Sequence, residues 1–165
     1  MFRRSLVRRL SAALLLGLPA LADPAPRLKP LTRFQAATLE RARDGAARKL
    51  ATPDCLTLLE DFQDEAGRPL SEKLAQYQRS APEYLRMIPF LDGSSERLCR
   101  GGRADAFTTM GIPRVFVCPS FVQKQVSDPP AAETIVIHEM LHTLGLGENP
   151  PTSREITAIV GSRCR

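Results

Sequence analysis

The sequence contains no tryptophan, and only two tyrosines and two histidines occur among its 165 residues. It therefore lacks the aromatic clusters on which proteins stack single-stranded nucleic acid. Its formal net charge of +5 does not point to nucleic acid either, because four of the 23 basic residues lie within the first 22 positions. Beyond position 22 the chain has 19 basic and 18 acidic residues. We therefore expect no nucleic-acid partner, and the charge gives no reason to expect binding to anionic membranes.

The chain also lacks an apolar run at its N-terminus that is long enough to cross a bilayer. The run from Leu10 to Leu18 is short, follows four arginines and precedes Ala20-Leu-Ala22. A basic segment, a short apolar segment and a small-residue cleavage motif are the three parts of a secretory signal. We therefore expect residues 1–22 to be a signal peptide and the protein to be exported, with no stable membrane anchor after cleavage.

After this segment, residues 23–30 contain three prolines and are expected to form an extended leader. The remaining residues, 31–165, have the length of one domain.

The chain has four cysteines but no C-x-x-C motif, which argues against a cysteine-ligated metal. In an exported protein, four cysteines indicate two disulfides with three possible pairings. We favour Cys99–Cys118 together with Cys55–Cys164. The second bond would tie the C-terminal helix to the N-terminal helices.

Apolar periodicity predicts an α+β domain. Helices are expected over residues 31–50, from Thr52-Pro53 through Phe62, from Leu70 to Tyr77, over about 131–144 and over 152–164. Strands are expected over 84–91 and 114–118, and residues 94–102 are expected to form a loop.

Both histidines belong to one motif, His138-Glu-Met-Leu-His142. Four residues are just over one helical turn, so both imidazoles lie on one face and can bind the same zinc ion. Glu139 lies one step round the helix, where it can act as a general base on a zinc-bound water. A catalytic zinc site needs a third protein ligand, and with the cysteines in disulfides this must be a carboxylate. Glu148 is the first candidate, because Gly145 and Gly147 allow the chain to turn back after the helix.

The segment from His138 to Glu148 resembles the metzincin signature H-E-x-x-H-x-x-G-x-x-H, with glutamate in place of the third histidine. The resemblance covers about residues 114–155. It implies a small zincin-like domain with a short mixed sheet above the active-site helix, zinc on His138 and His142, and Glu139 as the base. Gluzincins take a glutamate from a later helix instead, which makes Glu155 the alternative third ligand.

The resemblance implies a secreted zinc-dependent peptidase that acts on a peptide or protein substrate. Arg154 and Tyr84 are candidates to stabilise the developing oxyanion. The alternative is a non-catalytic exported domain that holds zinc for structure or for partner binding. The substrate and the oligomeric state are not determined by the sequence.

Overall fold

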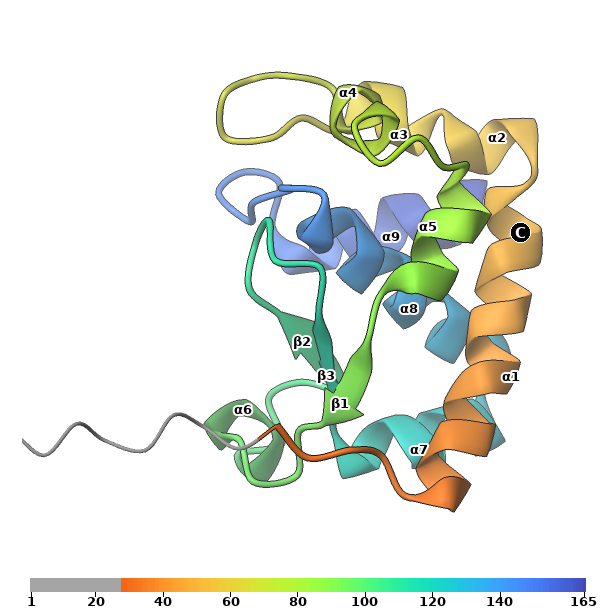
Figure 1. The fold of residues 1–165 in the computed structure, drawn as a ribbon, viewed down its shortest axis with the longest axis vertical. Coiled ribbons are helices and arrows are strands. Elements are labelled where there is room, and N and C mark those ends of the chain that lie inside the picture. The colour runs from red at the N-terminus through yellow and green to blue at the C-terminus, as the bar shows by residue number, and fades with distance from the viewer. Residues whose placement is uncertain (1–27) are drawn as a thin grey trace, which may run out of the picture.

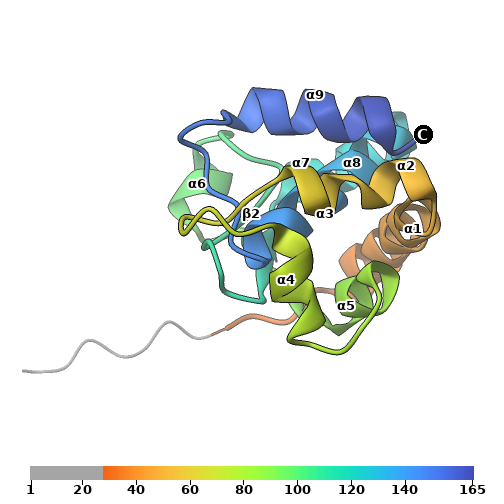
Figure 2. The same cartoon turned by 90° about the horizontal axis from the view of Figure 1, so that it is seen from above.

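Helix α8, Pro129–Thr143, lies at the centre of residues 28–165, the part of the chain described by this computed structural model. Helices α1, α7 and α9 and strand β2 all pack against α8. Figures 1 and 2 show α1 along one side of the molecule and α9 along another, with α8 between them. The expected signal peptide, residues 1–22, lies outside the described residues, as does most of the expected leader.

The helices and strands follow one another along the chain in this order. They are α1 (Arg33–Leu50), α2 (Pro53–Leu56), α3 (Leu58–Asp61), α4 (Leu70–Ala75), α5 (Ala81–Met87), β1 (Phe90–Asp92), α6 (Arg97–Arg100), β2 (Ala106–Thr108), β3 (Val115–Val117), α7 (Pro119–Ser127), α8 and α9 (Ser153–Arg163). The α+β class predicted from the sequence is confirmed.

The sheet is small and mixed, with strand order β1-β3-β2. Strand β1 runs parallel to β3, and β2 runs antiparallel to it. The central strand is the one predicted around Val115, whose β-branched and aromatic residues favour an extended backbone. Strand β2 is an edge strand, and it lies next to α8.

The apolar face of α8 forms the centre of the hydrophobic core. Ile137, Met140, Leu141 and Leu144 are all buried, as their spacing predicts. Helix α1 approaches α8 closely at Gly45, where an added Cβ would lie 2.0 Å from Glu133 Oε1. Glu133 in turn forms an ion pair with Lys49 at 2.8 Å. A side chain at position 45 would therefore displace the Glu133 carboxylate from its place beside Lys49.

Two disulfides connect the elements, and their pairing is the one favoured from the sequence. Cys55–Cys164 joins α2 to the end of α9. Cys99–Cys118 joins α6 to the residue that caps α7. Two such bonds are typical of a protein that resides in an oxidising compartment.

Several elements differ from the sequence predictions. The expected strand over 84–91 is largely wrong, because Ser80 and Glu83 form a capping box that begins α5, and strand β1 covers only Phe90–Asp92. The expected loop over 94–102 contains the one-turn helix α6. Strand β2 and helix α7 were not predicted at all. Helix α8 begins at Pro129 rather than Ala131, because Asp128 caps it and prolines in a first turn lose no helical hydrogen bond.

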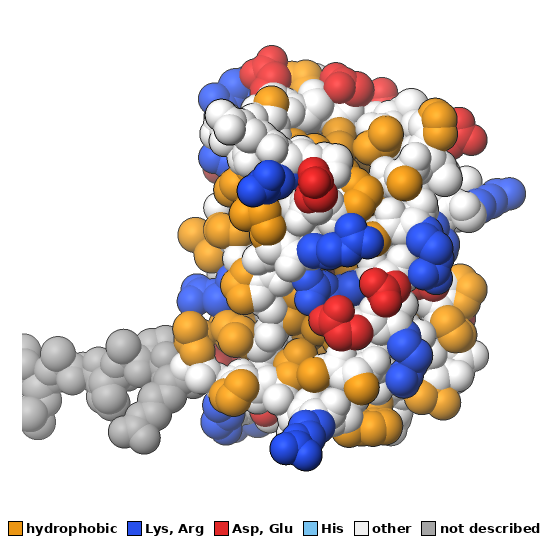
Figure 3. All heavy atoms as spheres, turned by 45° about the vertical axis from the view of Figure 1, so that its right-hand side comes forward, with side chains coloured by type: hydrophobic (Ala, Val, Ile, Leu, Met, Phe, Trp, Pro, Cys, Tyr) orange, Lys and Arg blue, Asp and Glu red, His pale blue; other side chains and the backbone are white. Residues whose placement is uncertain are grey.

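The surface carries interspersed charges of both signs. On the face shown in Figure 3, Lys and Arg side chains alternate with Asp and Glu side chains and with apolar ones. Within residues 28–165, no helix has the length and apolar character needed to cross a membrane.

Candidate metal centre

The imidazole rings of the two histidines on α8 converge, so that one nitrogen of each ring lies close to the other. His138 Nε2 and His142 Nε2 are 2.9 Å apart, as residues one turn apart on a helix allow. Both side chains are buried, on a different side of α8 from Ile137 and Leu144. The sequence motif therefore predicted the relative position of these two groups.

Glu148 joins the two histidines through the turn that follows α8. Gly145 has φ +112°, a conformation that favours glycine, and ends the helix as predicted. Leu146 then forms an isolated β-bridge with Asp64, which holds the returning chain. As a result, Glu148 Oε1 lies 3.2 Å from His142 Nε2 and 3.7 Å from His138 Nε2. One ligand atom from each of the three residues falls within 4.8 Å of the others, so the trio could hold a metal ion.

The alternative ligand, Glu155, has a different partner. Its Oε2 accepts hydrogen bonds from the backbone N–H of Thr152 at 2.8 Å and from the Thr152 hydroxyl at 2.9 Å. This is the capping box that the sequence predicted at the start of α9. The Glu155 carboxylate is therefore engaged at the helix terminus, and Glu148 is the carboxylate near the histidines.

Each histidine ring is also held through its second nitrogen. His142 Nδ1 lies 2.6 Å from the carbonyl oxygen of Leu146, which can only accept, so Nδ1 carries the proton and Nε2 keeps a free lone pair. His138 Nδ1 lies 3.0 Å from the Thr157 hydroxyl on α9. Such outer contacts orient metal-binding imidazoles and fix their tautomer.

Thr157 was missed in the sequence, although a signal was present. Ser153, Thr157 and Gly161 recur every four residues in the predicted C-terminal helix and so share one face. That face of α9 turns toward α8, and all three residues line one cavity beside His138. A stripe of small residues along one face of an amphipathic helix could have indicated that this face lines a binding site.

Glu139 lies beside this cluster and is buried, with only 6% of the residue exposed. Its pKa is raised to about 8, mainly by burial and also by the negative charge of Glu148, while a backbone hydrogen bond from Thr108 on β2 acts in the opposite direction. A carboxyl group held in this way can be poised for proton transfer near neutral pH.

His138 is shifted in the opposite sense. Its pKa is lowered to about 4, mainly by burial and also by the nearby His142, while Glu148 acts in the opposite direction. The ring is therefore neutral at pH 7 and can offer a lone pair to a metal ion.

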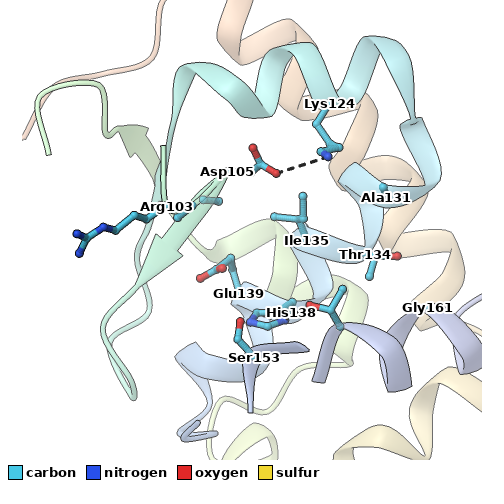
Figure 4. Close-up of a pocket in the computed structure, with 13 residues that line it drawn as sticks. Arg103, Asp105, Lys124, Ala131, Thr134, Ile135, His138, Glu139, Ser153 and Gly161 are labelled. Carbon is cyan, nitrogen blue, oxygen red and sulfur yellow. Dashed lines mark hydrogen bonds and ion pairs between the residues drawn. The ribbon is translucent and has the colours of Figure 1, made fainter. Parts of the chain in front are cut away.

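Two adjoining cavities form a cleft along this cluster. One has a volume of about 510 Å³ and the other about 470 Å³. The residues that line both are Arg103, Ala104, Ala106, His138, Glu139 and Ser153. Figure 4 shows Glu139 between β2 and His138, Ser153 beside His138, and the Arg103 side chain directed away from them. The cleft therefore runs between the edge strand β2 and the helices α8 and α9.

The two residues suggested as oxyanion donors are not part of this cleft. The Tyr84 hydroxyl is buried against Thr143 Oγ1 at 3.0 Å, and burial raises the pKa of Tyr84. Arg154 is exposed on α9 and lines neither cavity. Tyr84 instead ties α5 to the end of α8.

The burial of Glu139 predicts a pH-dependent stability for the metal-free protein. Because its folded pKa of about 8 exceeds the usual 4.5, the folded state binds the extra proton between these values. Stability is thus lost as pH rises from 4.5 to 8, by about 1.4 kcal/mol per pH unit at most. Glu139→Gln removes this loss, so it should stabilise the chelator-treated protein more at pH 8 than at pH 5. Urea unfolding at the two pH values measures this, and an equal effect at both would contradict the raised pKa.

Comparisons with known proteins identified no relative of this chain. No family model, no curated protein and no solved structure matches the chain.

Proposed function

We propose that the protein is an exported zinc-dependent peptidase whose zinc is held by His138, His142 and Glu148. One observation carries the proposal. Three potential ligand atoms converge next to a buried carboxyl group, Glu139, and all four residues line one open cleft. A site that held zinc only for structure would need the three ligands but would have no use for Glu139.

The spacing of the three ligand atoms supports zinc as the bound ion. Ligands at about 2.0–2.2 Å from a tetrahedral zinc lie roughly 3.3–3.6 Å apart from one another. The three separations here are 2.9, 3.2 and 3.7 Å, which bracket that range. Two imidazoles and one carboxylate are also a donor set that zinc binds in hydrolytic enzymes. The residues present therefore fit the ion.

Peptide-bond hydrolysis then assigns a role to each group in the cleft. When bound, zinc supplies Lewis-acid chemistry that lowers the pKa of a water molecule and polarises the scissile carbonyl. Glu139, in its ionised form, accepts a proton from the attacking water as the new C–O bond forms. It then donates that proton to the nitrogen of the leaving amine as the C–N bond breaks. Ser153 is the hydroxyl that lines both cavities beside His138, and we assign it to hydrogen bonding with the substrate carbonyl.

The edge strand β2 supports a polypeptide as the substrate. Its three residues pair with β3 on one side, and in the described part of the chain no strand pairs with the other side. Ala106 of this strand lines both cavities, and Phe107 and Thr108 line one of them. An extended peptide can add to such an edge through main-chain hydrogen bonds, which places its backbone beside the cleft.

The contact between Thr157 and His138 predicts an effect on metal affinity. Thr157→Val keeps the shape of the side chain but removes the hydroxyl, so His138 loses the group that orients its ring. We expect zinc affinity to fall roughly 10- to 100-fold. Thr157→Ser, which keeps the hydroxyl, should stay close to the wild type. Competition with a chromophoric chelator measures both variants, and equal affinities for Val and wild type would rule out the orienting role.

Hydrolysis of an unfolded, disulfide-free protein tests the proposed function against the alternative. We expect the purified protein to cleave such a substrate, to lose activity on chelation and to regain it with one equivalent of zinc. A protein that binds one equivalent of zinc but cleaves neither this substrate nor a random peptide library would instead be the non-catalytic exported zinc-binding domain.

A further inference from the structure

The two halves of the cleft differ in chemistry. The 470 Å³ cavity is bounded by four apolar side chains from four different segments: Leu98, Phe107, Met110 and Leu146. The 510 Å³ cavity is bounded by smaller side chains such as Ala131 and Thr134, and by the Lys124–Asp105 pair at 3.9 Å. Figure 4 shows this pair at the far end from Ser153. The 470 Å³ cavity, which we call the apolar half, therefore has an apolar wall beside the metal centre. The 510 Å³ cavity ends in charged groups.

Two large hydrophobic side chains are partly exposed to solvent inside the apolar half of the cleft. Leu98 is 40% exposed and Met110 is 37% exposed, and both line the cavity next to His142 and Glu148. Apolar side chains that are exposed together in a hollow, beside a few polar groups, are typical of a ligand-binding site.

Two contacts and a disulfide hold the apolar residues of this cavity in place. Met110 belongs to the turn between β2 and β3, in which the N–H of Gly111 donates to the carbonyl of His142 at 2.8 Å. Its sulfur also packs over Gly147, where an added Cβ would lie 3.5 Å from Met110 Sδ. Leu98 precedes Cys99, which the disulfide to Cys118 fixes to the end of β3. The apolar residues are therefore positioned relative to the ligands.

We propose that this half of the cleft is a subsite for one large apolar side chain of an extended peptide substrate. The proposal rests on the proposed function, because the peptide backbone is taken to lie along β2. Side chains alternate along an extended strand, so one that points into the cleft beside Glu148 meets Leu98, Met110 and Phe107. A carboxylate there would lose water against these apolar side chains and would lie near the carboxylate of Glu148.

Cleavage of a blocked octapeptide library tests the subsite. At one position next to the cleaved bond, we expect Leu, Met or Phe to be preferred over Asp or Glu by about 10- to 100-fold in kcat/KM. Met110→Lys should abolish this preference and favour Glu at that position, and Leu98→Asp should weaken it independently. Ile112→Lys is the matched control, because Ile112 is 40% exposed in the same turn but does not line the cavity. Its profile should stay that of the wild type.

Binding of the same peptides to the Glu139→Gln protein separates the two proposals. Apolar selectivity in binding without any cleavage by the wild type would contradict the peptidase function and keep the subsite. Cleavage with no apolar preference, or equal profiles for Met110→Lys and Ile112→Lys, would overturn the subsite and keep the function. Neither binding nor cleavage would overturn both.

Discussion

Replacement of Glu139 by glutamine is expected to lower kcat by roughly 10²- to 10⁴-fold, the range that a lost general base produces. Glutamine has nearly the same shape but cannot accept the proton of the attacking water. The ligand atoms of His138, His142 and Glu148 remain in place, so the variant should still bind one zinc. KM should change little, because Glu139 makes its contribution in the transition state.

Glu60→Gln is a suitable control for this loss. Glu60 is exposed on α3 and lines neither cavity of the cleft, so kcat for this variant should remain within about twofold of the wild type. Zinc content and unfolding midpoint, measured on the same samples, show whether each protein is loaded and folded. A Glu139→Gln protein that carries zinc and hydrolyses peptides at the wild-type rate would contradict the role of this residue.

Removal of the Cys55–Cys164 disulfide is expected to have the largest effect on stability. The bond joins cysteines 109 residues apart, and the chain-entropy model gives about 4.8 kcal/mol for a loop of that length. The Cys99–Cys118 bond spans 19 residues, for which the same model gives about 3.2 kcal/mol. Denaturant unfolding of the two double-alanine variants should rank them in this order.

The two disulfides should also differ in their effect on zinc. Cys164 follows α9 directly, and α9 carries Thr157 against His138. The double variant Cys55→Ala/Cys164→Ala should therefore weaken zinc binding about as much as Thr157→Val does, roughly 10-fold or more. The variant Cys99→Ala/Cys118→Ala should retain the affinity, because that bond holds α6 and not a ligand. The opposite ranking would show that α9 does not support the site.

The sequence predicted the parts of the centre that depend on local geometry. His138 and His142 are one turn apart on a strongly apolar helix, so their approach follows from helical periodicity alone. The return of Glu148 depends on Gly145, a residue whose positive φ could be expected at a helix end. The capping box at Thr152 likewise predicted where Glu155 would be engaged.

The parts that were missed depend on contacts between distant segments. Strand β2 has only three residues, and its extended form is stabilised by pairing with β3 rather than by its own pattern. Residues 84–87 are rich enough in apolar side chains to suggest a strand, but the capping box at Ser80 favours a helix. Thr157 acquires its position because α9 packs on α8, which periodicity does not predict.

Zinc titration of the wild type, Glu148→Ala and Glu155→Ala tests the central claim most directly. We predict one tightly bound zinc in the wild type, an affinity more than about 100-fold weaker in Glu148→Ala, and an affinity close to the wild type in Glu155→Ala. A wild-type protein that binds no zinc, or a loss of affinity in Glu155→Ala but not in Glu148→Ala, would contradict the account.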